Sequence, residues 1–219
     1  MLSRRLQNWH QMKPVFGRFE RIFENAHGYL ALLHLGGADA RQRAADVKAC
    51  CNADPDPLPD IRVLLAEANW RPHLVAAMAV WFSGYHSETV ELLWRRVDRG
   101  SWVTPQICAT LSVIDPDFPD NARSRLEAGC PLDTSELLAM TAMERHSAAG
   151  PAGSVHRSAK TANSLIHLVR MRAPTEKWIA ELENSSDLQK LIAEDFDHAD
   201  AIAEHWLNRV KDLKDSLRD

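Results

Sequence analysis

The chain has 219 residues, of which 45% are hydrophobic and 26% are charged, and its formal net charge is −4. These values are typical of a globular protein, and the acidic balance argues against a nucleic-acid binder that relies on an overall basic surface. No run of 18 apolar residues occurs, so we expect no membrane-spanning helix.

The cysteines and the N-terminal residues indicate in which cellular compartment the protein is expected. The four cysteines are Cys50, Cys51, Cys108 and Cys130, and no two of them form a C-x-x-C motif. The N-terminal MLSRRLQNWHQMKP carries positive charges but lacks the apolar core of a secretory signal. We therefore expect reduced, structural thiols in a cytoplasmic protein.

Helical periodicity begins in residues 1–52, which we interpret as an N-terminal helical cap. A short helix is predicted over 2–12, and a longer one over 15–35 that is ended by a Gly-Gly pair. Asp39 is predicted to cap a third helix, which reaches Cys51.

The region 53–146 is predicted to be a series of helices joined by short turns. After a proline-rich break, one helix is expected around IRVLLAEA, and Asn69 is the expected N-cap of the next. The buried stripe of that second helix is predicted to be Leu74, Met78 and Trp81. Further helices are expected over 87–99, 104–114, from the turn at 115–119 to 127, and over 133–146.

Residues 147–154, SAAGPAGS, are small and are expected to form a flexible loop. The remaining segment, 155–219, is predicted to be helical over 155–172, over 175–184 and from 187 to near the C-terminus, and to pack on the same domain. No strand signal stands out in any part of the chain. The predicted fold class is therefore all-α.

Two stretches of the middle region repeat. The segment PHLVAAMAV (72–80) aligns with PQICATLSV (105–113), which matches the two prolines and places Ala76 over Ala109. A further step of the same length reaches Met140 and Ala142. The offset between the two segments is 33 residues. A fixed period of this length is typical of stacked helical hairpins. The small residues are predicted to lie where neighbouring helices approach closely.

These residues carry a resemblance to a known class. The stretch 57–146 resembles the HEAT-like α-helical repeats of small bacterial proteins, in the Pro-led second helices quoted above and in the first helices IRVLLAEA and TVELLWRRV. The period is shorter than the ~40 residues usual for such units. The resemblance implies an α-solenoid of stacked antiparallel helix pairs, about three units long, with flanking helices.

Few motifs suggest chemistry. Glu24-x-x-His27 and Asp195-x-x-His198 have the i, i+3 spacing of di-iron carboxylate helices, but an acid and a histidine on an exposed helix surface explain both pairs more simply. No G-x-S-x-G, Walker or G-x-G-x-x-G motif occurs. We expect no cofactor, no bound metal and no catalytic residue, and we favour a protein that is not an enzyme.

Charge supplies candidate binding residues. The stretch 176–204 holds nine acids against two lysines. Such a surface steers a basic partner, although a merely solvated helix face explains the same charges. The candidate partner-binding residues are Trp70 and Arg71 at a turn between helices, with Glu194, Asp195, Asp197, Asp200 and Glu204 in the acidic stretch.

Size, acidity and the lack of catalytic motifs predict a non-catalytic protein-binding module. Its HEAT-like resemblance indicates a bacterial immunity protein that neutralises a cognate toxin. The partner would be a basic toxin domain, and we expect neither a membrane nor a nucleic acid as partner. The alternative is a HEAT-like nucleic-acid enzyme of the DNA glycosylase type, with Trp70 and Trp102 in its groove. That alternative requires Arg95, Arg96 and Arg99 on one exposed surface.

Overall fold

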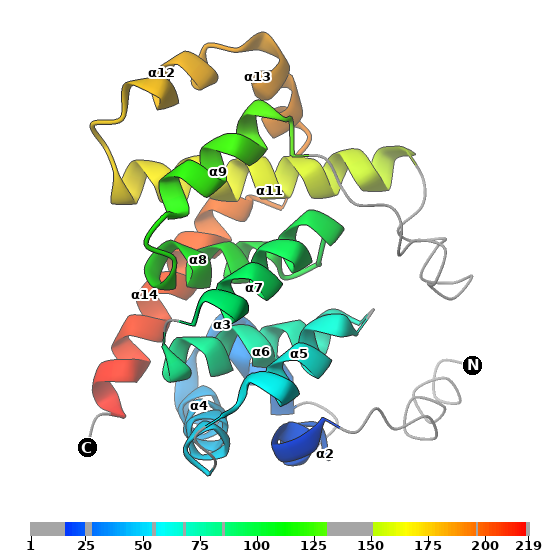
Figure 1. Ribbon diagram of the computed structural model, residues 1–219, viewed down its shortest axis with the longest axis vertical. Helices are drawn as coiled ribbons and strands as arrows, with labels where there is room; N and C mark the ends of the chain where they lie inside the picture. The colour runs from blue at the N-terminus through cyan, green and yellow to red at the C-terminus, as the bar shows by residue number, and fades with distance from the viewer. Residues whose placement is uncertain are drawn as a thin grey trace.

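In the computed structural model, the described residues are 16–24, 28–53, 56–67, 69–84, 86–130, 151–195 and 197–217 (Figure 1). Of residues 151–155 only the backbone is described. Within these ranges the secondary structure is helical and no strand occurs, which confirms the all-α prediction. None of the described helices combines the length and the apolar character needed to cross a membrane.

The N-terminal part forms short helical pieces, so the single helix predicted over 15–35 is wrong. The pieces are η1 (Gly17–Phe19), α2 (Glu20–Glu24), η2 (Gly28–Leu30) and α3 (Ala31–His34). Gly17 has a positive φ of 53°, and a Cβ there would lie 2.1 Å from Oδ1 of Asp60. Leu35 takes a left-handed conformation after α3. The helix predicted over 2–12 lies outside the described residues.

The next helix, α4 (Gly37–Asn52), starts slightly earlier than predicted. Gly36 is its N-cap, and Asp39 lies in its first turn, where a carboxylate favours the positive end of the helix dipole. The Gly-Gly pair therefore starts this helix as well as ending the preceding segment.

The middle of the chain forms two helix pairs. They are α5 (Leu58–Ala66) with α6 (Trp70–Ser83), and α7 (Ser87–Arg99) with α8 (Thr104–Ile114). The pairs lie side by side, since α5 also packs on α7 and α6 packs on α8. Asn69 caps α6 as predicted, because its side-chain oxygen accepts a hydrogen bond from the backbone N–H of Arg71 at 3.1 Å. The helix predicted over 133–146 lies outside the described residues.

The second helices of both pairs are buried on every side. Ten consecutive residues of α6, Pro72–Trp81, are buried, and so are the first nine of α8, Thr104–Ser112. The stripe of Leu74, Met78 and Trp81 was therefore too narrow a prediction. A helix that is apolar all round belongs in the middle of a protein. Ala76 and Ala109 are both fully buried, as their place in the repeat predicts.

The C-terminal helices complete the same core. They are α11 (Pro151–Arg172), α12 (Lys177–Glu183), α13 (Ser186–Ala193) and α14 (Ala199–Ser216), preceded by α9 (Phe118–Glu127). Both α11 and α14 pack on α8 and on each other, whereas α12 and α13 lie at the end of the molecule opposite α2 and α4 (Figure 1). Residues 151–154, predicted as loop, are the first turn of α11. The helix predicted from 187 to the C-terminus is broken at His198, whose φ is +54°.

Long side chains of α11 and α14 make hydrogen bonds to the end of α8 and to α3. Arg172, at the end of α11, donates to the backbone oxygens of Ser112 at 2.9 Å and Asp115 at 2.5 Å, which lie at the C-terminal end of α8. Trp206 of α14 is almost fully buried and its indole N–H donates to the carbonyl of Leu32 at 3.1 Å. Helices α11 and α14 therefore share the core of the helix pairs.

The four cysteines are free and buried. Burial raises the pKa of the Cys51, Cys108 and Cys130 thiols. Because the thiolate is the reactive form of cysteine, these thiols are poor nucleophiles. Their role is to fill the core.

One histidine lies inside the stack. His73 of α6 is 1% exposed, and its ring nitrogens contact the hydroxyl of Ser101 at 2.9 Å and the carbonyl oxygen of Glu67 at 2.7 Å. Burial, reinforced by the neighbouring Arg96 guanidinium, lowers the pKa of His73 to about 3. The imidazole is therefore neutral in the folded protein at physiological pH.

This histidine predicts a loss of stability in mild acid. The unfolded chain protonates His73 below its ordinary pKa of about 6.5, whereas the folded protein does so only near 3. In that window the unfolded state binds the extra proton, so the free energy of unfolding falls as the pH falls, by up to ~1.4 kcal/mol per pH unit. Urea denaturation between pH 7 and pH 5 measures this slope. His73→Gln should flatten this slope; a slope as steep as that of the wild type would contradict the assignment.

Candidate functional site

Aromatic and cationic side chains gather at the turns that precede α6 and α8. Trp70 packs edge-on against Tyr29, with ring centroids 6.1 Å apart, and lies 4.9 Å from Trp102. The guanidinium of Arg71 lies over the rings of Tyr29 and Trp70, and its Nε donates to the Tyr29 hydroxyl at 2.6 Å. Trp102 is 55% exposed, the largest exposed fraction of any large hydrophobic residue described. We call Trp70, Arg71 and Trp102 the aromatic cluster.

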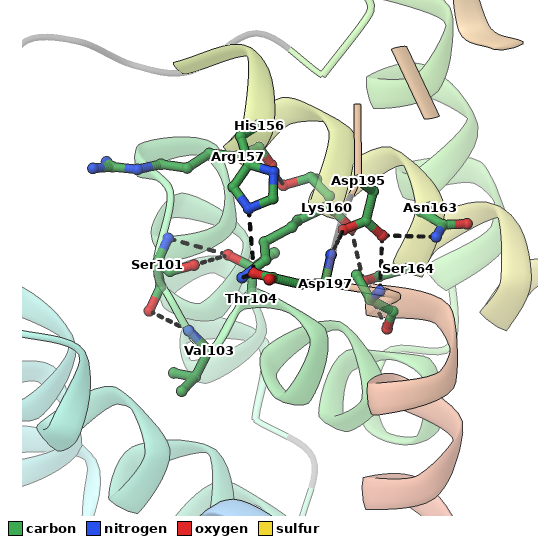
Figure 2. Close-up of polar contacts among 12 residues, drawn as sticks. Ser101, Val103, Thr104, His156, Arg157, Lys160, Asn163, Ser164, Asp195 and Asp197 are labelled. Atoms are coloured by element: carbon green, nitrogen blue, oxygen red, sulfur yellow. Dashed lines mark hydrogen bonds and ion pairs between the residues drawn. The ribbon is translucent and has the colours of Figure 1, made fainter. Parts of the chain in front are cut away.

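A polar cluster lies beside it, where the first half of α11 meets the segment between α13 and α14 (Figure 2). The ammonium of Lys160 lies 2.5 Å from Oδ2 of Asp197, although Lys160 is only 4% exposed. His156, one helical turn earlier, contacts the same carboxylate oxygen at 3.2 Å. These two partners hold the pKa of the Asp197 carboxyl below its usual range, with the hydrogen bond from Lys160 as the main cause. Asp197 is therefore ionised at neutral pH.

The polar cluster and the aromatic cluster are in contact. The Lys160 ammonium also lies 5.4 Å from the centre of the Trp102 ring, which gives it a cation–π partner on its other side. Lys160 thus joins the two groups of residues that the sequence singled out, Trp70 with Arg71 on one side and Asp197 on the other.

A cavity of about 370 Å³ adjoins both clusters, through Trp102 of the first and Lys160 and Asp197 of the second. Four elements enclose it: α3, the start of α8, α11, and the start of α14 with the segment before it. Its walls are mostly apolar, with Leu33, Pro105, Ala201 and Ile202. The polar lining residues are Gln106, Lys160, Asp197 and the histidines His34, His198 and His205. Because Trp102 lines the cavity and is also more than half exposed, it lies at the mouth.

Asp195 has a structural task. It is 8% exposed, and its carboxylate accepts hydrogen bonds from the Ala199 backbone N–H and from the Asn163 side-chain amide, both at 2.8 Å. The first of these bonds satisfies an N–H at the start of α14, and the backbone N–H of Asp197 donates to the other carboxylate oxygen at 3.2 Å. Asp195 therefore fixes the backbone that carries Asp197 to the cavity.

The other predicted acids are spread around this region. Glu194 is exposed, and its backbone oxygen contacts Nδ1 of His156 at 3.0 Å. Asp200 is half-buried in the first turn of α14, and Glu204, one turn further on, contacts Nε2 of His167 at 3.0 Å. Of the five predicted acids, Asp197 lines the cavity and is also partly exposed.

The arginines of the WRRVDRG turn do not share one surface. Arg95 is exposed and pairs with Glu91 on the same helix. Arg96 is 5% exposed and donates to the backbone oxygens of Glu67 at 3.3 Å and Gly100 at 3.1 Å. Trp94 is buried, and its indole N–H donates to Asp115 at 2.8 Å. The geometry therefore gives no support to a basic groove built from this turn.

The site offers no arrangement for metal chemistry in the part of the chain that is described, where no group of three or more His, Cys, Asp or Glu side chains is placed to hold an ion. The carboxylate of Asp195, in Asp195-x-x-His198, accepts the hydrogen bonds at the start of α14. His27, of the other pair with this spacing, lies outside the described residues. What the arrangement can do is bind: an exposed aromatic ring flanks a mostly apolar cavity that holds a few polar groups.

Several residues of the site were missed from the sequence, and Lys160 and Gln106 are the two that matter most for the cavity. Lys160 lies in an ordinary amphipathic stretch of α11, and Gln106 in a run of apolar residues in α8. The sequence did contain a signal for Gln106: a glutamine inside an otherwise apolar helix is expected to be buried, and a buried amide needs a hydrogen-bond partner or a functional role. Lys160 had no such signal, because its burial depends on helices that are distant in the sequence. No family model, curated protein or solved structure matches this chain.

Proposed function

We propose that this protein is a non-catalytic binding module that recognises a protein partner through the aromatic cluster and the adjoining cavity mouth. The observation that carries the proposal is the 55% exposure of Trp102, in contact with Trp70 and at the mouth of a cavity. Tryptophan, tyrosine and arginine dominate the binding energy of protein interfaces, and they act best beside a pocket. Tyr29, Trp70, Arg71 and Trp102 form such a group.

The charge around the cavity favours a basic partner. Asp197 and Glu194 lie on its α14 side and are at least partly exposed, and α12 and α13 add further exposed acids such as Glu181 and Asp187. Acidic surfaces of this kind steer basic partners and speed their association. This supports the specific proposal of an immunity protein that neutralises a basic toxin domain. The free, buried cysteines support a reducing, cytoplasmic location.

We also propose that the pairs α5–α6 and α7–α8 are two HEAT-like repeat units. The support is the aligned prolines and alanines of α6 and α8, together with the packing of each helix on its counterpart in the next pair. Repeat arrays use an extended surface for binding, and the aromatic cluster lies at the corresponding turns of the two units, before α6 and before α8.

The test is a comparison of two single substitutions in affinity capture from the native host. Wild type is expected to retain one stoichiometric protein, and Trp102→Ala should lose it, since removal of a central aromatic anchor costs about 2 kcal/mol or more of binding energy. Val113→Ala is the matched control, because Val113 is 46% exposed and lies at the other end of α8. If the wild type retains no protein, or Trp102→Ala retains it as well as the control does, the proposal is wrong.

A further inference from the structure

An unsatisfied polar group lies in the cavity wall. Gln106 lines the cavity, is 3% exposed, and its Oε1 is buried without a hydrogen-bond partner among the described residues. Leaving a buried acceptor unpaired costs about 1–3 kcal/mol. The terminal torsion of a glutamine side chain is soft, so the amide of this lining residue can reorient to meet a ligand in the cavity. A ligand that donates one hydrogen bond would satisfy it.

The charges of the cavity are already balanced. The only described lysine or arginine on its wall, Lys160, is paired with Asp197 and covered by the Trp102 ring. A further charge in this mostly apolar site would have to be desolvated, and the lysine and aspartate of its lining already neutralise each other. The cavity therefore favours an uncharged occupant.

The lining of the cavity suits an aromatic ring. Trp102 lies at the mouth, and Leu33, Pro105 and Ile202 supply apolar walls. Aromatic rings pair with one another in offset or edge-on geometries and gain ~0.5–1.5 kcal/mol beyond simple burial. The volume of about 370 Å³ lies near the small end of the roughly 300–1,000 Å³ found for ligand pockets. A single or fused ring suits it better than a larger molecule.

We propose that this cavity binds an uncharged aromatic ring that carries one N–H or O–H donor, such as an indole, with Gln106 accepting the hydrogen bond and Trp102 flanking the ring. The ring has two sources: the side chain of a tryptophan in a protein partner, or a free heteroaromatic molecule. With the first source the inference rests on the proposed function and names the anchor of the partner. With the second, the cavity is a ligand site in its own right.

The test uses indole and 1-methylindole, which differ in the N–H donor, measured by isothermal titration calorimetry on the full chain. Wild type is expected to bind indole with one saturable site and 1-methylindole about tenfold more weakly or worse, because the methylated ring leaves Oε1 of Gln106 unpaired. Gln106→Leu should bind both rings equally and unfold at the same temperature as wild type or higher, since it removes an unsatisfied buried amide. Gln189→Leu, on the exposed face of α13, should keep the wild-type discrimination.

A second variant tests the same cavity if Gln106→Leu folds poorly. Ala201 lines the cavity from an exposed position on α14, so Ala201→Phe should fold and block both rings, whereas Ala201→Ser should not. Equal binding of indole and 1-methylindole by wild type, or undiminished binding by Ala201→Phe, would overturn the proposal, as would the absence of saturable indole binding.

N-acetyltryptophanamide separates the two sources of the ring. Binding as tight as that of indole identifies the tryptophan side chain of a peptide, and binding of indole alone identifies a free molecule. The outcome is independent of the capture experiment: a chain that holds its partner through Trp102 but ignores indole refutes only the cavity assignment. A chain that binds indole but captures no partner refutes only the proposed function.

Discussion

Ala109→Trp is expected to lower the free energy of unfolding by about 3 kcal/mol, because overpacking a filled core costs ~1–3 kcal/mol and occasionally more. Ala109 is fully buried, and α8 is enclosed by α6, α7, α9, α11 and α14, so the core has no direction in which an indole could be accommodated. Ala76→Trp on α6 should behave in the same way. Urea denaturation followed by circular dichroism measures both changes.

Val113→Trp is the control for that experiment. Val113 lies one turn after Ala109 on the same helix but is 46% exposed, so a tryptophan there should change the free energy of unfolding by less than ~0.5 kcal/mol. If Ala109→Trp and Ala76→Trp are as stable as Val113→Trp, the close helix contact assigned to these alanines is wrong.

Asp115→Ala is expected to cost about 3–4 kcal/mol. This residue is 2% exposed, and its carboxylate accepts hydrogen bonds from the Trp94 indole at 2.8 Å, from the Asn121 amide at 3.0 Å and from the Asp117 backbone N–H at 2.9 Å. Hydrogen bonds to a charged group contribute ~1.5–3 kcal/mol each, and their loss leaves the buried indole N–H unpaired. The midpoint of thermal unfolding should fall by several degrees.

Asp117→Ala is the matched control, since this exposed neighbour is two residues away in the same turn. Its effect should stay within ~0.5 kcal/mol. Asp115→Asn should fall between the two, because an amide oxygen can still accept from Trp94 but carries no charge. A loss of stability as large in Asp117→Ala as in Asp115→Ala would show that the turn itself, rather than the buried carboxylate, holds α7 and α9 together.

The elements that sequence patterns predicted best are those whose signals are local. Asn69 followed by a proline and an apolar run located α6 to within a residue, and Thr104-Pro105 located the start of α8. The breaks that were missed depend on distant residues. Gly17 bends the chain where the Asp60 side chain leaves no room for a Cβ, and the break at His198 is held by Asp195, whose carboxylate was read as a surface charge.

The candidate site was predicted in parts. The sequence alone shows tryptophan and arginine at a turn between helices and acids in a charged stretch. In the structure Trp70 packs on Trp102, and both Trp102 and Asp197 line the cavity. The residue that connects the two groups, Lys160, could not be identified from the sequence. Lys160 comes from a helix between the two stretches, and its contacts with Trp102 and Asp197 exist only once α11 and α14 have packed on α8. Periodicity reports which face of a helix is apolar, but not which partner covers it.

The burial of Thr104–Ser112, most of α8, has a consequence for how the protein folds during synthesis. During translation α8 leaves the ribosome well before α11 and α14, the helices that cover much of its surface. Until α14 has been synthesised, the apolar surfaces of α8 and of the helices packed against it are exposed to other nascent chains. Exposed apolar surface of this kind makes folding intermediates prone to aggregate. Native packing around α8 is therefore completed only once α14 has been synthesised and has packed against α8.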